Sequence, residues 1–283
     1  MTVRQRMISE VRPSQATQDG AGVAIQRVAL MGHPGTDPIL LIDELKSPFR
    51  EDFEAGFPSH PHRGMQTLTY MKRGGLIHED SLGNRGEIRD GGAQWMSAGC
   101  GVIHSEMPTQ DTQGLHGFQL WFNLPAAEKM RPPRYRDVPA DQLTTLRTTA
   151  FSATAVAGDW QLNGQPLTGP LVELTPQGTL LDLDISADAL VDIAVAPDDS
   201  LLAYVYDGSV VGTEETIPAG HLLVATDGDC WQLQAGKAGA RLLVLSGRPI
   251  RETVVGYGPF VMNTRVEIEQ ALQDYRDGNF AQQ

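Results

Sequence analysis

The chain has 283 residues, of which 41% are hydrophobic, so it can bury one large core or two medium ones. Its formal net charge is −13 and it contains no cluster of Lys and Arg, which argues against nucleic acid and anionic membranes as partners. No apolar run has the length of a signal-peptide core or a membrane span, and the 2 cysteines lie far apart. We therefore expect a cytoplasmic protein without a disulfide framework.

Short runs rich in Val, Leu, Ile, Thr and Tyr recur along the chain, separated by many of its 30 glycines and 18 prolines. Apolar runs of this length between turn residues predict an all-β protein built as a sandwich or barrel. The clearest runs are residues 66–71, 101–107, 117–124, 180–185, 201–208, 221–226 and 240–247.

An internal repeat indicates that these strands form two related halves. It places Tyr70 on Tyr204, and the halves meet in the polar stretch 137–154. We expect two tandem antiparallel β-barrels, in residues 1–140 and 141–283. The aligned segments are 67–75 with 201–209 and 88–99 with 217–228.

One α-helix is predicted near the end of the chain. Thr264 and Glu267 have capping-box spacing, and apolar residues then recur at helical spacing until Gly278. We expect this helix to run from about Thr264 to Asp277 and to fold back against the barrels.

Two histidines, His60 and His62, stand one residue apart just before a predicted strand. Pro61 between them favours an extended backbone at His60, and side chains two residues apart on an extended chain point the same way. By itself this pattern is also typical of loop histidines that face water.

A second pair, His104 and Glu106, lies two residues apart within another strand-like run. If the two pairs lie on adjacent strands, they can converge on one cation. Three neutral imidazoles and one carboxylate suit a divalent transition metal such as Fe, Mn, Co, Ni, Cu or Zn better than Ca or Mg.

The repeat provides an internal control for this hypothesis. Extended without gaps, it places all four polar positions on apolar residues of the second half, so the fold itself does not require polar side chains there. We therefore expect one metal ion per chain, in the N-terminal barrel. The aligned residues are Ala194, Ala196, Leu233 and Ala235, in the order His60, His62, His104 and Glu106.

The other histidines are expected to have structural roles. We expect His33 in a loop, His78 as a solvated strand residue and His221 in the half without a site. His116 is expected to be satisfied structurally rather than to support a metal ligand. Cys100, close to the second ligand pair, is expected to be a small buried thiol.

At these residues the chain resembles the pirin family of the cupin superfamily. The resemblance implies a bicupin, with two jelly-roll-type barrels and one metal ion, usually iron, in the N-terminal barrel. The implied ligands are three histidines and one glutamate, which fall on His60, His62, His104 and Glu106. Gln66 stands where the family commonly has Glu. The matching segments include "HPHRGMQTLTYM" (60–71), "WMSAGCGVIHSEMP" (95–108), "FQLWFNLP" (118–125) and residues 247–275.

The resemblance also implies a function. Bacterial pirin-like proteins are similar to quercetinases (quercetin 2,3-dioxygenases), which open the central ring of flavonols with O2 and release carbon monoxide. We therefore expect an oxidoreductase that uses Fe2+, a flavonol-like substrate and O2. The metal would lower the pKa of the bound 3-hydroxyl, and Glu106 would serve as catalytic base as well as ligand.

Two alternatives remain open at this point. The first is a redox-sensing regulatory module, in which the state of the iron alters a surface that contacts a protein partner. The second is a cupin whose metal is only structural.

Overall fold

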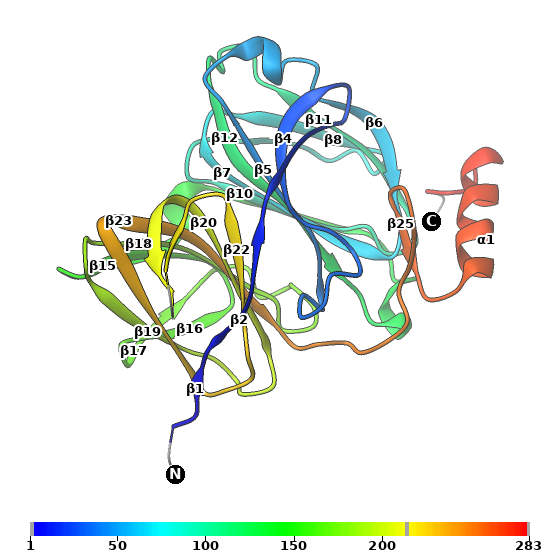
Figure 1. The fold of residues 1–283 in the computed structure, drawn as a ribbon. Helices are drawn as coiled ribbons and strands as arrows, with labels where there is room; N and C mark the ends of the chain where they lie inside the picture. Colours follow the sequence, from blue (N-terminus) through cyan, green and yellow to red (C-terminus); the bar gives the residue numbers. More distant parts are fainter. Residues whose placement is uncertain (1–2, 213–214, 282–283) are drawn as a thin grey trace. The chain divides into compact units, whose positions relative to one another are not determined.

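The computed structural model describes residues 3–212 and 215–281, which are mostly β-structure (Figure 1). Residue contacts divide the chain into two compact units. We call them the histidine barrel (Ala16–Gly32, Ile39–Asp141 and Ile250–Gln283) and the apolar barrel (Met1–Gln15, His33–Pro38 and Gln142–Pro249).

The histidine barrel contains two sheets, with strand orders β13-β10-β7-β12-β5-β4-β3 and β6-β11-β8-β9. Neighbouring strands from β13 to β4, and throughout the second sheet, run antiparallel. The elements are β3 (Gln15–Asp19), β4 (Val23–Ala29), β5 (Ile39–Ser47), η1 (Arg50–Asp52), β6 (Phe57–His62), β7 (Met65–Arg73), β8 (Leu76–Asp80), β9 (Arg85–Ile88), β10 (Ala93–Ser97), β11 (Val102–Pro108), β12 (Leu115–Asn123), η2 (Ala126–Glu128), β13 (Arg134–Val138), η3 (Ala140–Gln142), β24 (Val255–Tyr257), β25 (Phe260–Met262) and α1 (Arg265–Arg276).

Apolar side chains from both sheets of the histidine barrel form a shared cluster. Strands β4, β5, β7 and β12 contribute from one sheet, and β8 and β9 from the other, so the sheets pack face to face. The cluster consists of Val23, Ile25, Leu45, Phe53, Met71, Leu76, Ile88 and Leu115.

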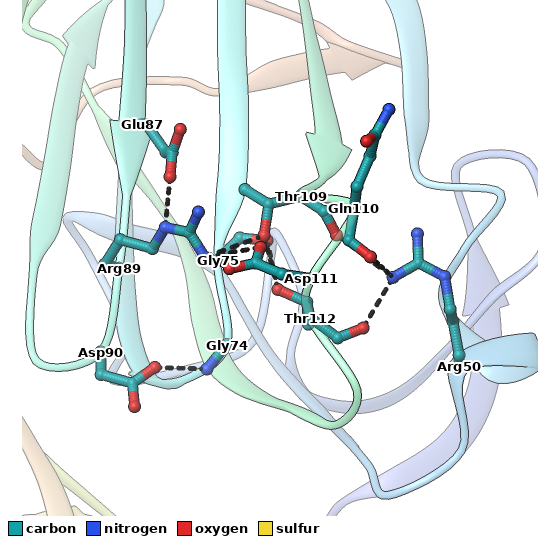
Figure 2. A network of polar contacts seen from close by, with 10 residues as sticks. All are labelled: Arg50, Gly74, Gly75, Glu87, Arg89, Asp90, Thr109, Gln110, Asp111 and Thr112. Atoms are coloured by element: carbon teal, nitrogen blue, oxygen red, sulfur yellow. Dashed lines mark hydrogen bonds and ion pairs between the residues drawn. The ribbon is translucent and has the colours of Figure 1, made fainter.

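A polar network holds the loop that follows β11 (Figure 2). Arg50 Nη1 donates to three backbone carbonyls of residues 109–112, at 2.6–3.3 Å. Arg89 Nη1 donates to the carboxylate of Asp111 at 2.8 and 2.9 Å, and Arg89 also pairs with Glu87. The network therefore fixes the carboxyl end of β11, the strand that carries His104 and Glu106.

In the apolar barrel, one sheet has the order β14-β15-β18-β23-β19-β16-β17 and is joined by β1, β2, β20, β21 and β22. Its core is an extensive apolar cluster that includes Trp160 and Trp231. The strands are β1 (Gln5–Arg6), β2 (Ile8–Pro13), β14 (Thr144–Arg147), β15 (Phe151–Ala157), β16 (Asp159–Leu162), β17 (Gln165–Thr168), β18 (Thr179–Ile185), β19 (Leu190–Ala194), β20 (Ser200–Val211), β21 (Thr216–Pro218), β22 (His221–Ala225) and β23 (Cys230–Gly247). Residues 213–214 lie outside the description.

The internal repeat is confirmed by strand pairing. The order β13-β10-β7-β12-β5-β4 in the histidine barrel corresponds to β2-β22-β20-β23-β18-β15 in the apolar barrel. Tyr70 pairs with residues of β10 and β12, and Tyr204 pairs with residues of β22 and β23. The two tyrosines thus occupy equivalent positions, and the expected all-β bicupin is confirmed.

The two units differ from the contiguous halves 1–140 and 141–283. β2 pairs with β22 in the apolar barrel, where it takes the place that β13 takes in the histidine barrel. Residues 250–283, in turn, belong to the histidine barrel. Each end of the chain therefore completes the unit that is formed mainly by the other half of the sequence.

The predicted C-terminal helix is confirmed as α1, with Thr264 as its N-cap and the capping box with Glu267 formed. Its buried residues Ile268 and Ala271 pack in an apolar cluster with Phe260 of β25, beside which the helix lies in Figure 1. α1 has 12 residues, and no helix in the described part of the chain is long and apolar enough to cross a membrane.

Candidate metal centre

The structure brings His60, His62 and His104 together. β6 pairs with β11 so that His60 lies directly opposite His104, and His62 lies two residues further along the same strand. The ring centroids are 4.4–5.0 Å apart. One nitrogen atom from each ring can be chosen so that all three lie within 4.8 Å of one another.

Hydrogen bonds indicate which ring nitrogens carry protons. Nδ1 of His60 lies 2.8 Å from the carbonyl oxygen of Pro58, and Nδ1 of His62 lies 3.3 Å from that of Pro259. Each Nδ1 must donate, which leaves the Nε2 atoms with lone pairs that face each other at 3.1 Å. Nε2 of His104 is buried without a hydrogen-bond partner among the described residues. Three such nitrogens fit a divalent transition metal ion.

Burial keeps two of these imidazoles neutral. Burial, together with the smaller effect of the nearby His60, lowers the pKa of His62 to about 3. Burial also lowers the pKa of His104, with further contributions from His62, His60 and His78. Neutral imidazole is the form that coordinates metals, so these pKa shifts favour ligation at neutral pH.

The fourth expected ligand, Glu106, lies on the wall of the same cavity but outside the close group. Among residues 3–212 and 215–281, the group with mutually close ligand atoms consists of the three histidines. The extra residue of the β6–β11 ladder lies on β6, between Phe57 and His60, whereas β11 pairs regularly with β8. Glu106 therefore lies on the same face of β11 as His104. Oε1 of Glu106 instead accepts a hydrogen bond from Thr69 Oγ1 at 2.9 Å.

The expectation of a solvated His78 is wrong. His78 is 1% exposed, stacks on the ring of Tyr135, and places its Nδ1 3.3 Å from Nδ1 of His104. Its Nε2 lies 3.3 Å from Asp80 Oδ2. The sequence contained a signal for this arrangement, because His78 and Asp80 form another pair spaced two residues apart on a strand.

The cavity beside the histidines has a volume of about 640 Å³, within the range of pockets that enclose small organic ligands. His60, His62 and Glu106 contribute polar groups to its wall. Trp121 meets His62 edge-on, with ring centroids 5.1 Å apart. The apolar lining residues include Ile25, Leu40, Leu41, Leu45, Phe57 and Trp121.

Two other polar residues singled out in the sequence face elsewhere. Gln66 lies three residues before Thr69 on β7 and therefore on the opposite face of the strand from the Glu106 contact. His116 Nε2 lies 2.9 Å from Glu44 Oε1, which agrees with the structural role expected for it.

The residues that replace the histidines in the apolar barrel also need a correction. Ala194 and Ala196 are exposed and are not the counterparts of His60 and His62. Leu233, which is aligned with His104, pairs with Val191, just as His104 pairs with His60. Val191 and Ile193 are therefore the counterparts of His60 and His62. The segment between β19 and β20 is three residues longer than that between β6 and β7, which explains the slip.

The corrected positions again indicate that the fold does not require polar side chains where the histidine barrel has its expected metal ligands. Val191, Ile193, Leu233 and Ala235 are all buried in its apolar core. The fold therefore builds the equivalent site without polar side chains.

Comparison with known proteins establishes the family. Residues 24–122 match the Pirin family and residues 180–281 match the Pirin C-terminal cupin domain. The chain belongs to the pirin family. It is 43% identical to a candidate quercetin 2,3-dioxygenase of Vibrio cholerae over 98% of both chains, and 37% identical to a pirin-like protein of Caulobacter vibrioides over 97% of this chain and 99% of that protein.

Solved structures of pirin relatives share this fold. The quercetin 2,3-dioxygenase of Acinetobacter baumannii matches with a TM-score of 0.87 and 27% identity, over 98% of both chains. The pirin YhhW of Escherichia coli, solved in complex with nickel(II), matches with a TM-score of 0.60 and 21% identity, over 85% of this chain and 99% of that chain.

Proposed function

We propose that this pirin is a metal-dependent dioxygenase that opens the central ring of flavonols such as quercetin with O2. The observation that carries the proposal is the convergence of His60, His62 and His104 beside a largely apolar cavity, whose wall also contains Glu106. The names of the Vibrio cholerae and Acinetobacter baumannii relatives support the same reaction.

In this proposal His60, His62 and His104 hold one divalent transition metal ion, with Fe2+ as the first candidate. Glu106, as the fourth ligand, would lower the net charge at the metal by one. When bound, the metal supplies a positive centre that lowers the pKa of the substrate's 3-hydroxyl and supports reaction with O2.

The protein residues position the flavonol and handle its proton. Glu106 accepts the proton of the 3-hydroxyl, and the hydrogen bond from Thr69 Oγ1 keeps its carboxylate in place. Phe57, Trp121 and Leu45 offer apolar surface to the flat rings and exclude water from the cavity.

The test is aerobic incubation of the Fe2+-loaded protein with quercetin. We expect loss of the flavonol absorbance together with O2 uptake and release of carbon monoxide. The matched control is the double variant His60→Ala, His62→Ala, which should leave quercetin unchanged. Intact quercetin after incubation with fully metal-loaded wild-type protein would refute the proposal and favour the regulatory alternative.

A further inference from the structure

A continuous row of polar residues crosses one sheet of the histidine barrel. Its members are consecutive cross-strand partners, so their side chains lie on the same face of the sheet. From β4 to β13 the row consists of Arg27, Asp43, Gln119, Thr69, Gln94 and Asp137. We call it the polar row.

The apolar barrel has a counterpart of this row with no polar side chain. Because Tyr204 corresponds to Tyr70, Ala203 corresponds to Thr69, and its ladder partners define the rest of the row. Five of these six residues are fully buried in the apolar core. The counterparts are Ala155, Leu181, Val244, Ala203, Leu223 and, at the edge, Val11.

The apolar counterpart shows which residue types the fold itself requires at these positions. A sheet of the same topology packs with Ala, Leu and Val at these positions, so the polar residues of the histidine barrel are not required for folding. The members of the polar row are hydrogen-bonded to one another, but replacing such buried pairs by apolar residues is often neutral or even stabilising, so stability alone does not explain the row. A role in ligand recognition accounts for it.

One half of the polar row faces the cavity. Arg27, Asp43 and Gln119 line it together with His60, His62 and Glu106. Arg27 forms a two-pronged pair with Asp43, with Nε–Oδ1 and Nη2–Oδ2 distances of 3.0 and 2.8 Å. Arg27 also pairs with Asp19, another lining residue.

The charges of this wall define the ligand chemistry that it accepts. Asp19, Asp43 and Arg27 together carry a net charge of about −1, which disfavours a carboxylate on the part of the ligand that contacts these three residues. Carboxylate oxygens and Gln119 Oε1 accept hydrogen bonds from hydroxyl groups, and Gln119 Nε2 can donate one. Gln119 Oε1 already accepts from Thr69 Oγ1 at 2.6 Å, and its second lone pair is available to a ligand. Asp43 is 4% exposed, so it retains little water with which a ligand hydroxyl would compete.

We propose that Arg27, Asp43 and Gln119 recognise phenolic hydroxyl groups of the substrate other than the 3-hydroxyl. The preferred substrates are therefore polyhydroxylated flavonols rather than flavonols with a bare ring system. This inference rests on the proposed function and narrows its substrate class.

The other half of the polar row provides a matched control. Gln94 Nε2 donates to Asp137 Oδ1 at 2.8 Å, and Tyr135 OH donates to the same oxygen at 2.7 Å. These side chains satisfy one another, and Gln94 is 3% exposed. Gln94→Leu therefore makes the same chemical change as Gln119→Leu, but at a position of the polar row that lies two strands away from Gln119.

The experiment compares two flavonols that share the 3-hydroxyl and 4-carbonyl. Quercetin carries four further hydroxyl groups and 3-hydroxyflavone carries none. Binding to the Fe2+-loaded protein is measured by absorbance without O2, so that no turnover is needed. We expect the wild type to bind quercetin at least about tenfold more tightly, since a hydrogen bond to a charged group typically contributes this much.

Two variants should remove this preference. Gln119→Leu, and the double variant Arg27→Met with Asp43→Leu, should each lower the quercetin to 3-hydroxyflavone affinity ratio by about fivefold or more. The double variant replaces the Arg27–Asp43 pair by apolar residues, and the other partner of Arg27, Asp19, is exposed, so no buried charge is left unpaired. Metal content and circular dichroism confirm that the variants are folded.

The outcomes separate this inference from the proposed function. If both flavonols bind but the ratio is unchanged in the two variants, the inference is overturned and the proposed function stands. If Gln94→Leu lowers the ratio as much as Gln119→Leu, recognition by the cavity wall is also refuted. If the metal-loaded wild type binds neither flavonol, the proposed function fails and this inference fails with it.

Discussion

The Nδ1 atoms of His78 and His104 lie 3.3 Å apart in the interior of the histidine barrel. One of them must carry a proton and the other must accept it. With Asp80 beside Nε2 of His78, the consistent assignment puts the proton of His78 on Nε2, so that His104 donates through Nδ1. Nε2 of His104 is then left with a lone pair for a metal ion. A carboxylate on β8 thus orients a ligand on β11 through an intervening histidine.

We therefore predict that His78→Phe weakens metal binding by about 10-fold to 100-fold, the range typical for loss of a partner behind a metal ligand. Phe retains the stacking on Tyr135 but cannot accept the proton of His104. The measurement is competition with a chromogenic chelator at neutral pH, with His221→Phe in the apolar barrel as control. Equal affinities in wild type and His78→Phe would contradict the assigned role.

The buried histidines predict how the metal-free protein responds to acid. The pKa of His62 is lowered to about 3 in the folded chain, against 6.5 for an ordinary histidine, and that of His104 is also lowered. Below pH 6.5 the unfolded chain binds protons that the folded chain does not, so stability falls as the pH drops from 6.5 toward 3. Each group contributes up to about 1.4 kcal/mol per pH unit.

This dependence can be measured by denaturant unfolding of the chelator-treated protein at several pH values. The variant His62→Leu removes one titrating group and should show a shallower loss of stability over the same range. Parallel curves for the two proteins would show that His62 does not titrate as its burial requires.

We predict one tightly bound metal ion per chain. The apolar barrel has Val191, Ile193, Leu233 and Ala235 where the histidine barrel has its polar positions. Elemental analysis should therefore give a metal-to-protein ratio near one, and a ratio near zero for the double variant His60→Ala, His62→Ala. Two tightly held ions per chain would mean that metal also binds outside the histidine barrel.

Glu106→Gln tests the proposed role of this carboxylate in proton transfer. The variant keeps the size of the side chain but loses its charge and basicity, so flavonol turnover should fall by about two orders of magnitude or more. Metal occupancy should fall much less because three imidazoles remain. Turnover is compared at matched iron loading, and an undiminished rate would remove Glu106 from the catalytic role.

Lys129 is predicted to stabilise the histidine barrel from its interior. It is 1% exposed, and its Nζ donates to Asn123 Oδ1 and to the carbonyl oxygens of Gly64 and Val261, at 2.6–3.0 Å. Lys129→Met leaves these acceptors unsatisfied and should lower the free energy of unfolding by roughly 3 kcal/mol. Urea denaturation checks this, with the exposed Lys46→Met as control. Indistinguishable midpoints for the two variants would contradict it.

The parts of the fold that depend on local sequence could be predicted. Thr264 and Glu267 define the start of α1 by themselves, and the pairs at His60 and His104 need only the two-residue period of a strand. The two-residue spacing of His78 and Asp80 indicates that their side chains share a face, but the burial of that face could not be predicted, because Tyr135 and His104, which enclose His78, are remote in sequence. The two-residue spacing correctly predicts that Glu106 shares a face of β11 with His104, but its hydrogen bond with Thr69 depends on β7, which is remote in sequence.

The first residues of the chain belong to the apolar barrel and the last residues belong to the histidine barrel. This arrangement affects the order in which the two units can be completed during synthesis on the ribosome. The apolar barrel is complete once residue 249 has emerged, whereas the histidine barrel still lacks residues 250–283. Those residues include Pro259, whose carbonyl receives the proton of His62, and Asp274, which pairs with the buried Arg63 next to that ligand. The part of this chain that is synthesised first therefore forms most of the unit whose remaining residues are synthesised last. The contacts that support His62 and Arg63 are therefore completed only once residues 250–283 have been synthesised, later than all parts of the apolar barrel.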